Sequence, residues 1–450
     1  MSPRSRHLLV PLAAAALLLG AAGTAAPAPA AAGGAHRSWL VTADPVAKRV
    51  YVNDAETGRR TATLSGIAFG THAGSVQLGH GRIAFMDESA PQLDVLAIRA
   101  DGTARIAEHY AIPDGDGRWE RAGWLSADAA HRHLAVGSDF DGSTDQRVTV
   151  IDLESGKERT AEIPTSAVTL ATTGETGTEE VETFLVGSPL RLVVTAGGRL
   201  DAYLVSSILQ GVTHPHRVAT TPLGAYPHGP LVDASGTVVG SDLATGVQTV
   251  HVTATGFSHA RSTAYPEAHA QRYRPRMAPD GTTAVGTQAG TTPAGTTWDH
   301  VPAWLTTTST SSSIMRSVAL GEGTASRAAV TSRFAAVALT SGSGDSLVLV
   351  RTASDGAYDG RAISLPLEPL STGPVAGRPA TGAPARAVAA TDDGRSVFVT
   401  RGGEGTVTQI SARGSRPSVT RTITLPTALQ DGGYLTTVDS STTPYDLSGR

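Results

Sequence analysis

The sequence predicts an all-β fold made of one repeated unit, and three observations support this prediction. Short apolar runs alternate with polar residues at the period of two that a β-strand requires. Fifty of the 450 residues are glycine, and Gly and Asp separate the runs as turn residues do. The same strand-and-turn phrase recurs roughly every 45 to 60 residues, a spacing typical of propeller blades. We therefore expect a single β-propeller of seven or eight four-stranded blades.

The clearest copy of the unit is ARAVAATDDGRSVFVTRGGEGTVTQISARGSRPSVTRTITLP, residues 385–426. It contains an apolar strand at 387–390, a turn at Asp393-Gly394, alternating strands around Val397 and Val407, and a polar edge strand. The two ends of the chain complement each other, because the segment from Ser38 supplies about three strands and GGYLTTVDSS supplies one. Pairing of these N- and C-terminal strands would close the ring and remove two exposed sheet edges.

The first 32 residues have the pattern of a secretory signal peptide. Arg4 and Arg6 precede a short apolar run, and small residues follow it up to a cleavage point near Ala30 or Ala32. No later segment approaches the roughly 18 to 20 apolar residues of a membrane helix. We expect residues 1–32 to be removed and residues 33–450 to form the propeller domain of a secreted or extracytoplasmic monomer with no membrane span.

Composition excludes several kinds of chemistry and partner. The chain has no cysteine, so it forms no disulfide, thiolate metal site or cysteine nucleophile. A formal net charge of -4 with 17% charged residues argues against a nucleic-acid partner. No G-x-S-x-G nucleophile elbow stands between a strand and a helix. The sequence thus contains no complete catalytic constellation.

The phrases KRVYVNDAETGRRTATL and DDGRSVFVTRGGEGTVTQISA resemble the repeats of secreted YVTN-type, WD-like β-propellers, and VTVIDLESGKERTAEIP from Val148 is the best copy of the second half of that repeat. The resemblance implies the fold. Propellers of this type include binding proteins, lactone-cleaving enzymes and metal carriers, so function has to be argued from sites.

The histidines offer a candidate metal site. His214 and His216 are spaced H-x-H, which on a strand would place both rings on one face, about 6 to 7 Å apart. His228 follows in the same short stretch, THPHRVATTPLGAYPHGP, and we take these three as candidate ligands of Zn²⁺. The alternative is a polar loop between two strands. Ca²⁺ is less favoured, because Ser143 stands where the Asp139 loop would need a further ligand.

The segments LGHGRIAFMDESAPQLDVL and YPHGPLVDASGTVVGSDLATGVQTV resemble the exported zinc metallochaperones of the AztD type, which carry histidine-bound zinc to the binding protein of a metal transporter. Two residues match that pattern, His80 and His228. The resemblance implies an extracytoplasmic zinc carrier with a metal-transporter binding protein as its partner.

A second cluster combines basic and aromatic residues. Arg groups bind anions through paired hydrogen bonds, and Trp stacks on sugar rings. The cluster is a candidate site for an anionic or carbohydrate ligand, and its alternative role is to pack one blade against the next. Its members are Arg272, Tyr273, Arg274, Trp298 and His300.

Three functions are therefore open. The first is an exported, non-catalytic propeller that binds a small-molecule or protein partner at its loop face or central channel. The second is a zinc metallochaperone that uses the histidine cluster. The third is a lactonase-like hydrolase with a divalent cation in the channel, which would need acidic and histidine side chains from several blades to converge there.

Overall fold

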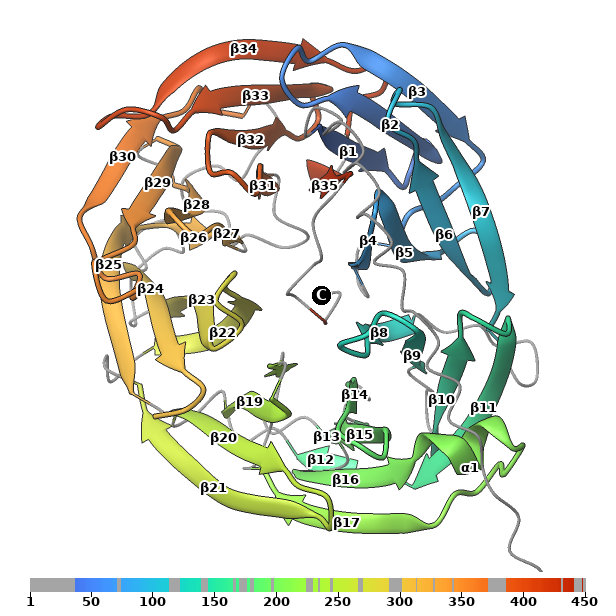
Figure 1. Cartoon of the computed structure of the whole chain (residues 1–450). Helices are drawn as coiled ribbons and strands as arrows, with labels where there is room; N and C mark the ends of the chain where they lie inside the picture. The colour runs from blue at the N-terminus through green and yellow to red at the C-terminus, as the bar shows by residue number, and fades with distance from the viewer. Residues whose placement is uncertain are drawn as a thin grey trace, which may run out of the picture. The chain divides into compact units, whose positions relative to one another are not determined.

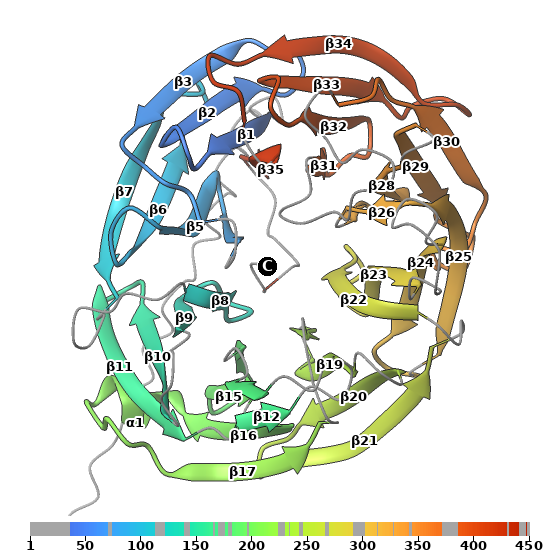
Figure 2. The ribbon, with the colours of Figure 1, turned by 180° about the vertical axis from the view of Figure 1, so that it is seen from behind.

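The computed structural model describes residues 37–70, 74–112, 122–138, 145–164, 167–169, 176–178, 182–195, 198–223, 230–233, 235–242, 246–265, 270–290, 302–312, 314–326, 328–341, 344–370, 386–429, 432–440 and 447. Within the unit Arg37–Arg450, these residues form eight antiparallel sheets arranged in a ring (Figure 1, Figure 2). The protein is a β-propeller, as the repeat predicts, and it has eight blades.

The first four blades, each given from its innermost strand outward, consist of β35 (Tyr434–Asp439), β1 (Ser38–Asp44), β2 (Arg49–Asp54) and β3 (Arg60–Ser65); β4 (Ser75–Gly79), β5 (Arg82–Asp87), β6 (Gln92–Ile98) and β7 (Ala104–Ala111); β8 (Ala122–Ala127), β9 (His133–Ser138), β10 (Asp145–Asp152) and β11 (Lys157–Pro164); and β14 (Thr183–Val186), β15 (Arg191–Thr195), β16 (Arg199–Leu204) and β17 (Arg217–Pro222).

The last four blades, in the same order, consist of β18 (Leu231–Val232), β19 (Thr237–Asp242), β20 (Gly246–Val252) and β21 (Phe257–Ala264); β22 (Ala270–Met277), β23 (Thr283–Gly290), β24 (Pro302–Ser309) and β25 (Met315–Glu322); β26 (Thr324–Ala325) and β27 (Ala329–Val330), which share one position, with β28 (Phe334–Thr340), β29 (Ser346–Arg351) and β30 (Ala362–Pro366); and β31 (Val388–Ala390), β32 (Ser396–Arg401), β33 (Thr406–Ser411) and β34 (Ser418–Thr424).

A hairpin and a short helix stand outside the eight sheets. The strands β12 (Ala167–Thr169) and β13 (Thr176–Thr178) pair as a separate hairpin between the third and fourth blades. A short helix, α1 (Val205–Leu209), follows β16 and packs on the third blade through Val205 and Ile208.

Burial changes from the middle of a blade to its outer edge. The middle strand β28 is buried along its whole length, whereas the outer strand β34 is exposed at six of its seven residues. A middle strand has a neighbouring blade on each face, so it reads as a continuous apolar run. An outer strand faces solvent, and polar residues are favoured there.

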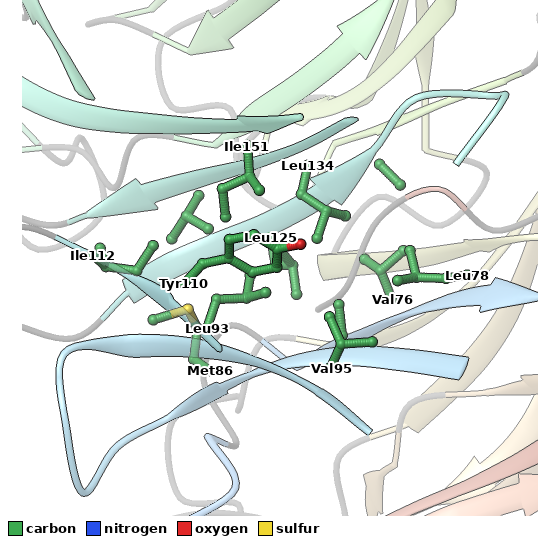
Figure 3. Packing of buried hydrophobic residues seen from close by; sticks show 13 residues of the cluster. Val76, Leu78, Met86, Leu93, Val95, Tyr110, Ile112, Leu125, Leu134 and Ile151 are labelled. Carbon is green, nitrogen blue, oxygen red and sulfur yellow. The ribbon is translucent and has the colours of Figure 1, made fainter. Parts of the chain in front are cut away.

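The core consists of apolar layers between neighbouring blades. Figure 3 shows the layer between the second and third blades, where Met86, Val95 and Tyr110 pack against Leu125 and Ile151. Full burial of one such side chain stabilises the fold by about 1.5–3 kcal/mol. Each blade is therefore held by its neighbours.

Pairing of the two terminal strands closes the ring, as predicted. β1 pairs with β35 in antiparallel register, with Val41 opposite Thr436. The Ser38 hydroxyl donates to Asp439 Oδ2 at 3.1 Å, across 401 residues of sequence. The innermost strand of the first blade thus comes from the end of the described chain, and β1 is paired on both sides.

Candidate functional site in the central channel

His214 and His216 lie in the connection between α1 and β17, at the outer edge of the fourth blade. Both side chains are exposed, and the Pro215 between them is buried. The backbone of Glu162 in β11 donates to the Thr213 carbonyl at 2.7 Å, and His214 Nε2 lies 3.6 Å from Glu162 Oε2. The H-x-H pair therefore belongs to a connection at the perimeter and not to a strand.

His228, the third candidate ligand, lies outside the described residues. Among the residues that are described, no group of three His, Asp or Glu side chains is arranged to hold a metal ion. Of the acidic calcium candidates, Asp139 and Asp141 also lie outside the described part of the chain, and Asp145 begins β10.

Several other histidines make local hydrogen bonds within blades. Nδ1 of His109 lies 2.7 Å from Asp94 Oδ1, and Nδ1 of His133 lies 3.0 Å from Asp128 Oδ2. Burial raises the pKa of the Asp94 carboxyl above its ordinary value, and the contact with His109 opposes this shift. These contacts connect neighbouring strands or fix a turn, which is a structural role.

Arg272, Tyr273 and Arg274 lie on β22, the innermost strand of the sixth blade. The ladder between β22 and β23 is irregular at this point, because Gln271 pairs with Ala289 whereas Arg274 pairs with Thr287. One extra residue on β22 makes a bulge, a feature that bends a strand and is frequent next to functional sites. Trp298 and His300, the other two members of the cluster, lie outside the described residues.

A cavity of about 120 Å³ lies between innermost strands of the first, second, sixth, seventh and eighth blades. It has room for about four water molecules, at roughly 30 Å³ each, or one small organic molecule. One part of its wall is apolar and another is polar. The wall includes Ala329, Val330, Val388 and Ala389 on β27 and β31, and Ser75, Gln77, Arg276, Asp392, Tyr434 and Thr437 among its polar residues.

Hydrogen bonds hold the polar wall in place. The hydroxyls of Ser75 and Tyr434 are 2.5 Å apart, Gln77 Nε2 donates to the Thr437 carbonyl at 2.8 Å, and Thr437 Oγ1 donates to the Ala390 carbonyl at 2.6 Å. These three bonds connect β4, β35 and β31, which belong to three different blades. The wall is therefore fixed before any ligand arrives.

Aromatic stacking supports the same wall from behind. The Tyr434 ring stacks on Phe69 with centroids 4.5 Å apart, and Phe69 stacks on Phe85 at 4.1 Å with an interplanar angle of 9°. Phe69 and Phe85 are fully buried. A ring stacked in this way loses rotamer freedom, so the Tyr434 hydroxyl has a defined position at the cavity.

The sequence pointed to Arg272 and Arg274 on β22 but not to the cavity, to which β22 contributes Arg276 and Met277. Its members are two to four residues at or next to the innermost strand of each of five blades, and no local motif marks them. One signal was present, because small residues recur in the innermost strands, as in AVAA at 387–390. Ala389 and Ala390 of this run line the cavity, together with larger side chains such as Arg276 and Tyr434.

Eight antiparallel blades in a ring define this protein as a β-propeller, and a cavity lies between innermost strands of five of them. No family model and no curated protein matches the sequence. Among solved structures, apo AztD from Citrobacter koseri aligns with a TM-score of 0.58 at 15% identity, over 91% of this chain and 100% of that chain. Dihydro-heme d1 dehydrogenase NirN in complex with DHE aligns with a TM-score of 0.53 at 14% identity, over 91% of this chain and 76% of that chain. At these identities the likeness establishes the fold alone.

Proposed function

We propose that this protein is an exported, non-catalytic binding protein that holds a small ligand in its central channel. The observation that carries the proposal is the cavity between five innermost strands, which has one apolar and one polar wall. Ligand sites in proteins combine an apolar lining with a few placed polar groups in this way. Export rests on the expected signal peptide at residues 1–32, and N-terminal sequencing of the released protein should find a start near Gly33.

The cavity wall indicates the kind of ligand. Ala329 and Val388 offer apolar contact, and Ser75 and Gln77 offer hydrogen-bonding groups on another strand. The ligand is therefore small, with a polar end and an apolar side. Because the wall is already ordered by hydrogen bonds, binding loses little conformational entropy in the protein.

Titration with three probes tests the proposal: L-leucine, butyrate and glucose, each added to the chain 33–450 and followed by calorimetry and thermal unfolding. We expect at least one probe to bind 1:1 with a Kd below about 1 mM, which corresponds to about 4 kcal/mol. Ala329→Leu, which adds bulk to the cavity wall, should weaken that binding at least tenfold. Val46→Leu, at a turn residue that is 60% exposed, is the matched control and should change nothing.

Two results would refute channel binding. One is that none of the three probes binds the wild-type protein. The other is that Ala329→Leu binds its probe as tightly as the wild type and Val46→Leu do.

Zinc carriage is the second candidate, and one observation favours it. His214 Nε2 and Glu162 Oε2 are 3.6 Å apart on the outer edge, and His216 follows two residues later. A neutral imidazole and an ionised carboxylate are both zinc ligands in proteins. With His228 as a third ligand, zinc titration at neutral pH should show one site of sub-micromolar affinity that is lost in His214→Ala and His228→Ala. Absence of that site removes this candidate.

A hydrolytic role has less support from the described residues. The cavity lining contains one carboxylate, Asp392, and no histidine among the described side chains. Cation-assisted hydrolysis needs several converging acidic or imidazole ligands. We therefore place binding ahead of turnover.

A further inference from the structure

Leu447 lies at the inner edge of an innermost strand. The amide of Ala127 on β8 donates to the Leu447 carbonyl at 2.8 Å. The other edge of β8 pairs with β9, where Ala127 is opposite Leu134. Because β8 is the innermost strand of the third blade, its edge opposite β9 faces the middle of the ring (Figure 1). Leu447 is therefore bound on the channel side of that blade.

The side chain of Leu447 is buried as well. It is 5% exposed and belongs to an apolar cluster whose other members come from the third, fourth and fifth blades. Trp124 of β8 and Phe184 of β14 belong to this cluster and meet edge to face, with ring centroids 5.9 Å apart. Val232 of β18 adds the next innermost strand. One aliphatic side chain is thus enclosed at the inner ends of three consecutive blades.

A backbone hydrogen bond to a strand edge, together with a pocket for one side chain, is how proteins bind extended peptides by strand addition. The edge amide contributes affinity for any extended chain, and the apolar cluster selects a large aliphatic residue. We propose that the inner edge of β8 and the Trp124–Phe184 cluster form a binding site for an extended polypeptide segment with a leucine-like side chain, and that Leu447 occupies this site in cis.

Because Leu447 of the same chain occupies the site, an external segment has to compete with it. A segment of the same chain acts at an effective concentration in the millimolar range, so an external segment binds only when it displaces residue 447. This site and the small-ligand cavity use different innermost strands: β8, β14 and β18 here, and β4, β22, β27, β31 and β35 there. The two proposals are therefore independent.

The test uses the full chain with Leu447→Asp, because a carboxylate is costly to bury and removes residue 447 from the cluster. The probe is a fluorescent synthetic peptide of residues 441–450, STTPYDLSGR, measured by anisotropy. Leu447→Met, which keeps an aliphatic side chain, is the matched control protein. A peptide with Asp in place of its leucine is the matched control probe.

We expect saturable 1:1 binding of the peptide to Leu447→Asp, and at least tenfold weaker binding to the wild type and to Leu447→Met, in which the site is occupied. The Asp peptide should not bind. Hydrogen exchange of the Ala127 amide should be faster in Leu447→Asp than in the wild type and should slow again when the peptide is added.

Equal affinity of the wild type and Leu447→Asp for the peptide would overturn the proposal. So would a folded Leu447→Asp protein, shown by its far-UV circular dichroism, that gives no saturable binding. If Leu447→Asp does not fold, Leu447→Ala empties the pocket without adding charge and is judged by the same two criteria.

Discussion

The buried ion pair between Arg386 and Asp345 should be a principal bond between the seventh and eighth blades. Arg386 Nε donates to Asp345 Oδ2 at 2.7 Å, and the two side chains are 2% and 5% exposed. The guanidinium also donates to the carbonyls of Glu368 and Thr400. Burial lowers the pKa of Arg386, and Asp345 opposes that shift. Arg386→Met would leave the Asp345 carboxylate buried without its counter-charge.

Loss of one partner of a buried pair costs about 3–5 kcal/mol. Unfolding entropy of about 2.1 cal/mol/K per residue gives roughly 0.8 kcal/mol/K for a unit of roughly 400 residues. We therefore expect Arg386→Met to lower the Tm by about 4–6 °C in differential scanning calorimetry.

Arg395→Met is the control, because Arg395 pairs with Asp393 at 3.2 Å on the surface of the eighth blade, with both side chains about half exposed. Surface pairs contribute at most about 1 kcal/mol, which corresponds to a Tm change of about 1 °C. Equal Tm losses in Arg386→Met and Arg395→Met would refute this reasoning. Combining Arg386→Met with Asp345→Leu should recover part of the loss, because no uncompensated charge remains.

Three further predictions concern ring closure, acid titration and turn geometry. Leu435→Ala in the closing strand β35 removes a side chain that is 6% exposed and should cost about 2–5 kcal/mol in denaturant unfolding; a loss below 1 kcal/mol would contradict a stabilising closure. His109→Ala removes the group that opposes the raised pKa of Asp94, so carbon-13 NMR should find a still higher pKa for that carboxyl. The folded protein then binds this proton more tightly than the unfolded chain, whose Asp94 pKa is 3.8, so the fold should gain stability as the pH falls from the folded pKa towards 3.8. An unchanged Asp94 titration would disprove the coupling. Gly405 has a φ of 64°, and Gly405→Ala places a Cβ 2.2 Å from the Thr427 carbonyl oxygen. It should lower the free energy of unfolding more than Gly156→Ala, which has a similar φ of 69° but open space around it and should cost only about 1–2 kcal/mol. Equal losses of stability in the two variants would show that the Thr427 contact relaxes.

The fold could be predicted from the sequence because its determinants are local and repeated. Each blade has its own alternation of apolar and polar residues and its own Asp or Gly turn, so the same unit can be recognised in repeated copies. The main ambiguity in blade number lay at residues 165–180, where the hairpin of β12 and β13 stands between two blades. An insertion of that kind resembles a blade boundary in sequence and belongs to no blade.

The candidate sites could be predicted only in part, because they depend on which strands meet across the ring. His214 and His216 have strand spacing but lie in a connection, and the five-residue helix that precedes them gives too little periodicity to detect. The cavity combines residues 75–77 with residues 434–437, which no local pattern relates. Leu447 stands alone among polar residues, so nothing in the sequence marks it as buried.

The pairing of β1 with β35 also fixes an order of events in time. Partners 401 residues apart cannot meet until almost the whole chain has been made. At 5–20 residues per second, roughly 400 residues take about 20–80 s to synthesise. For that interval β1 has a bare inner edge, and its blade has three strands at most. Until β35 emerges, a partly made chain cannot complete the first blade or close the ring.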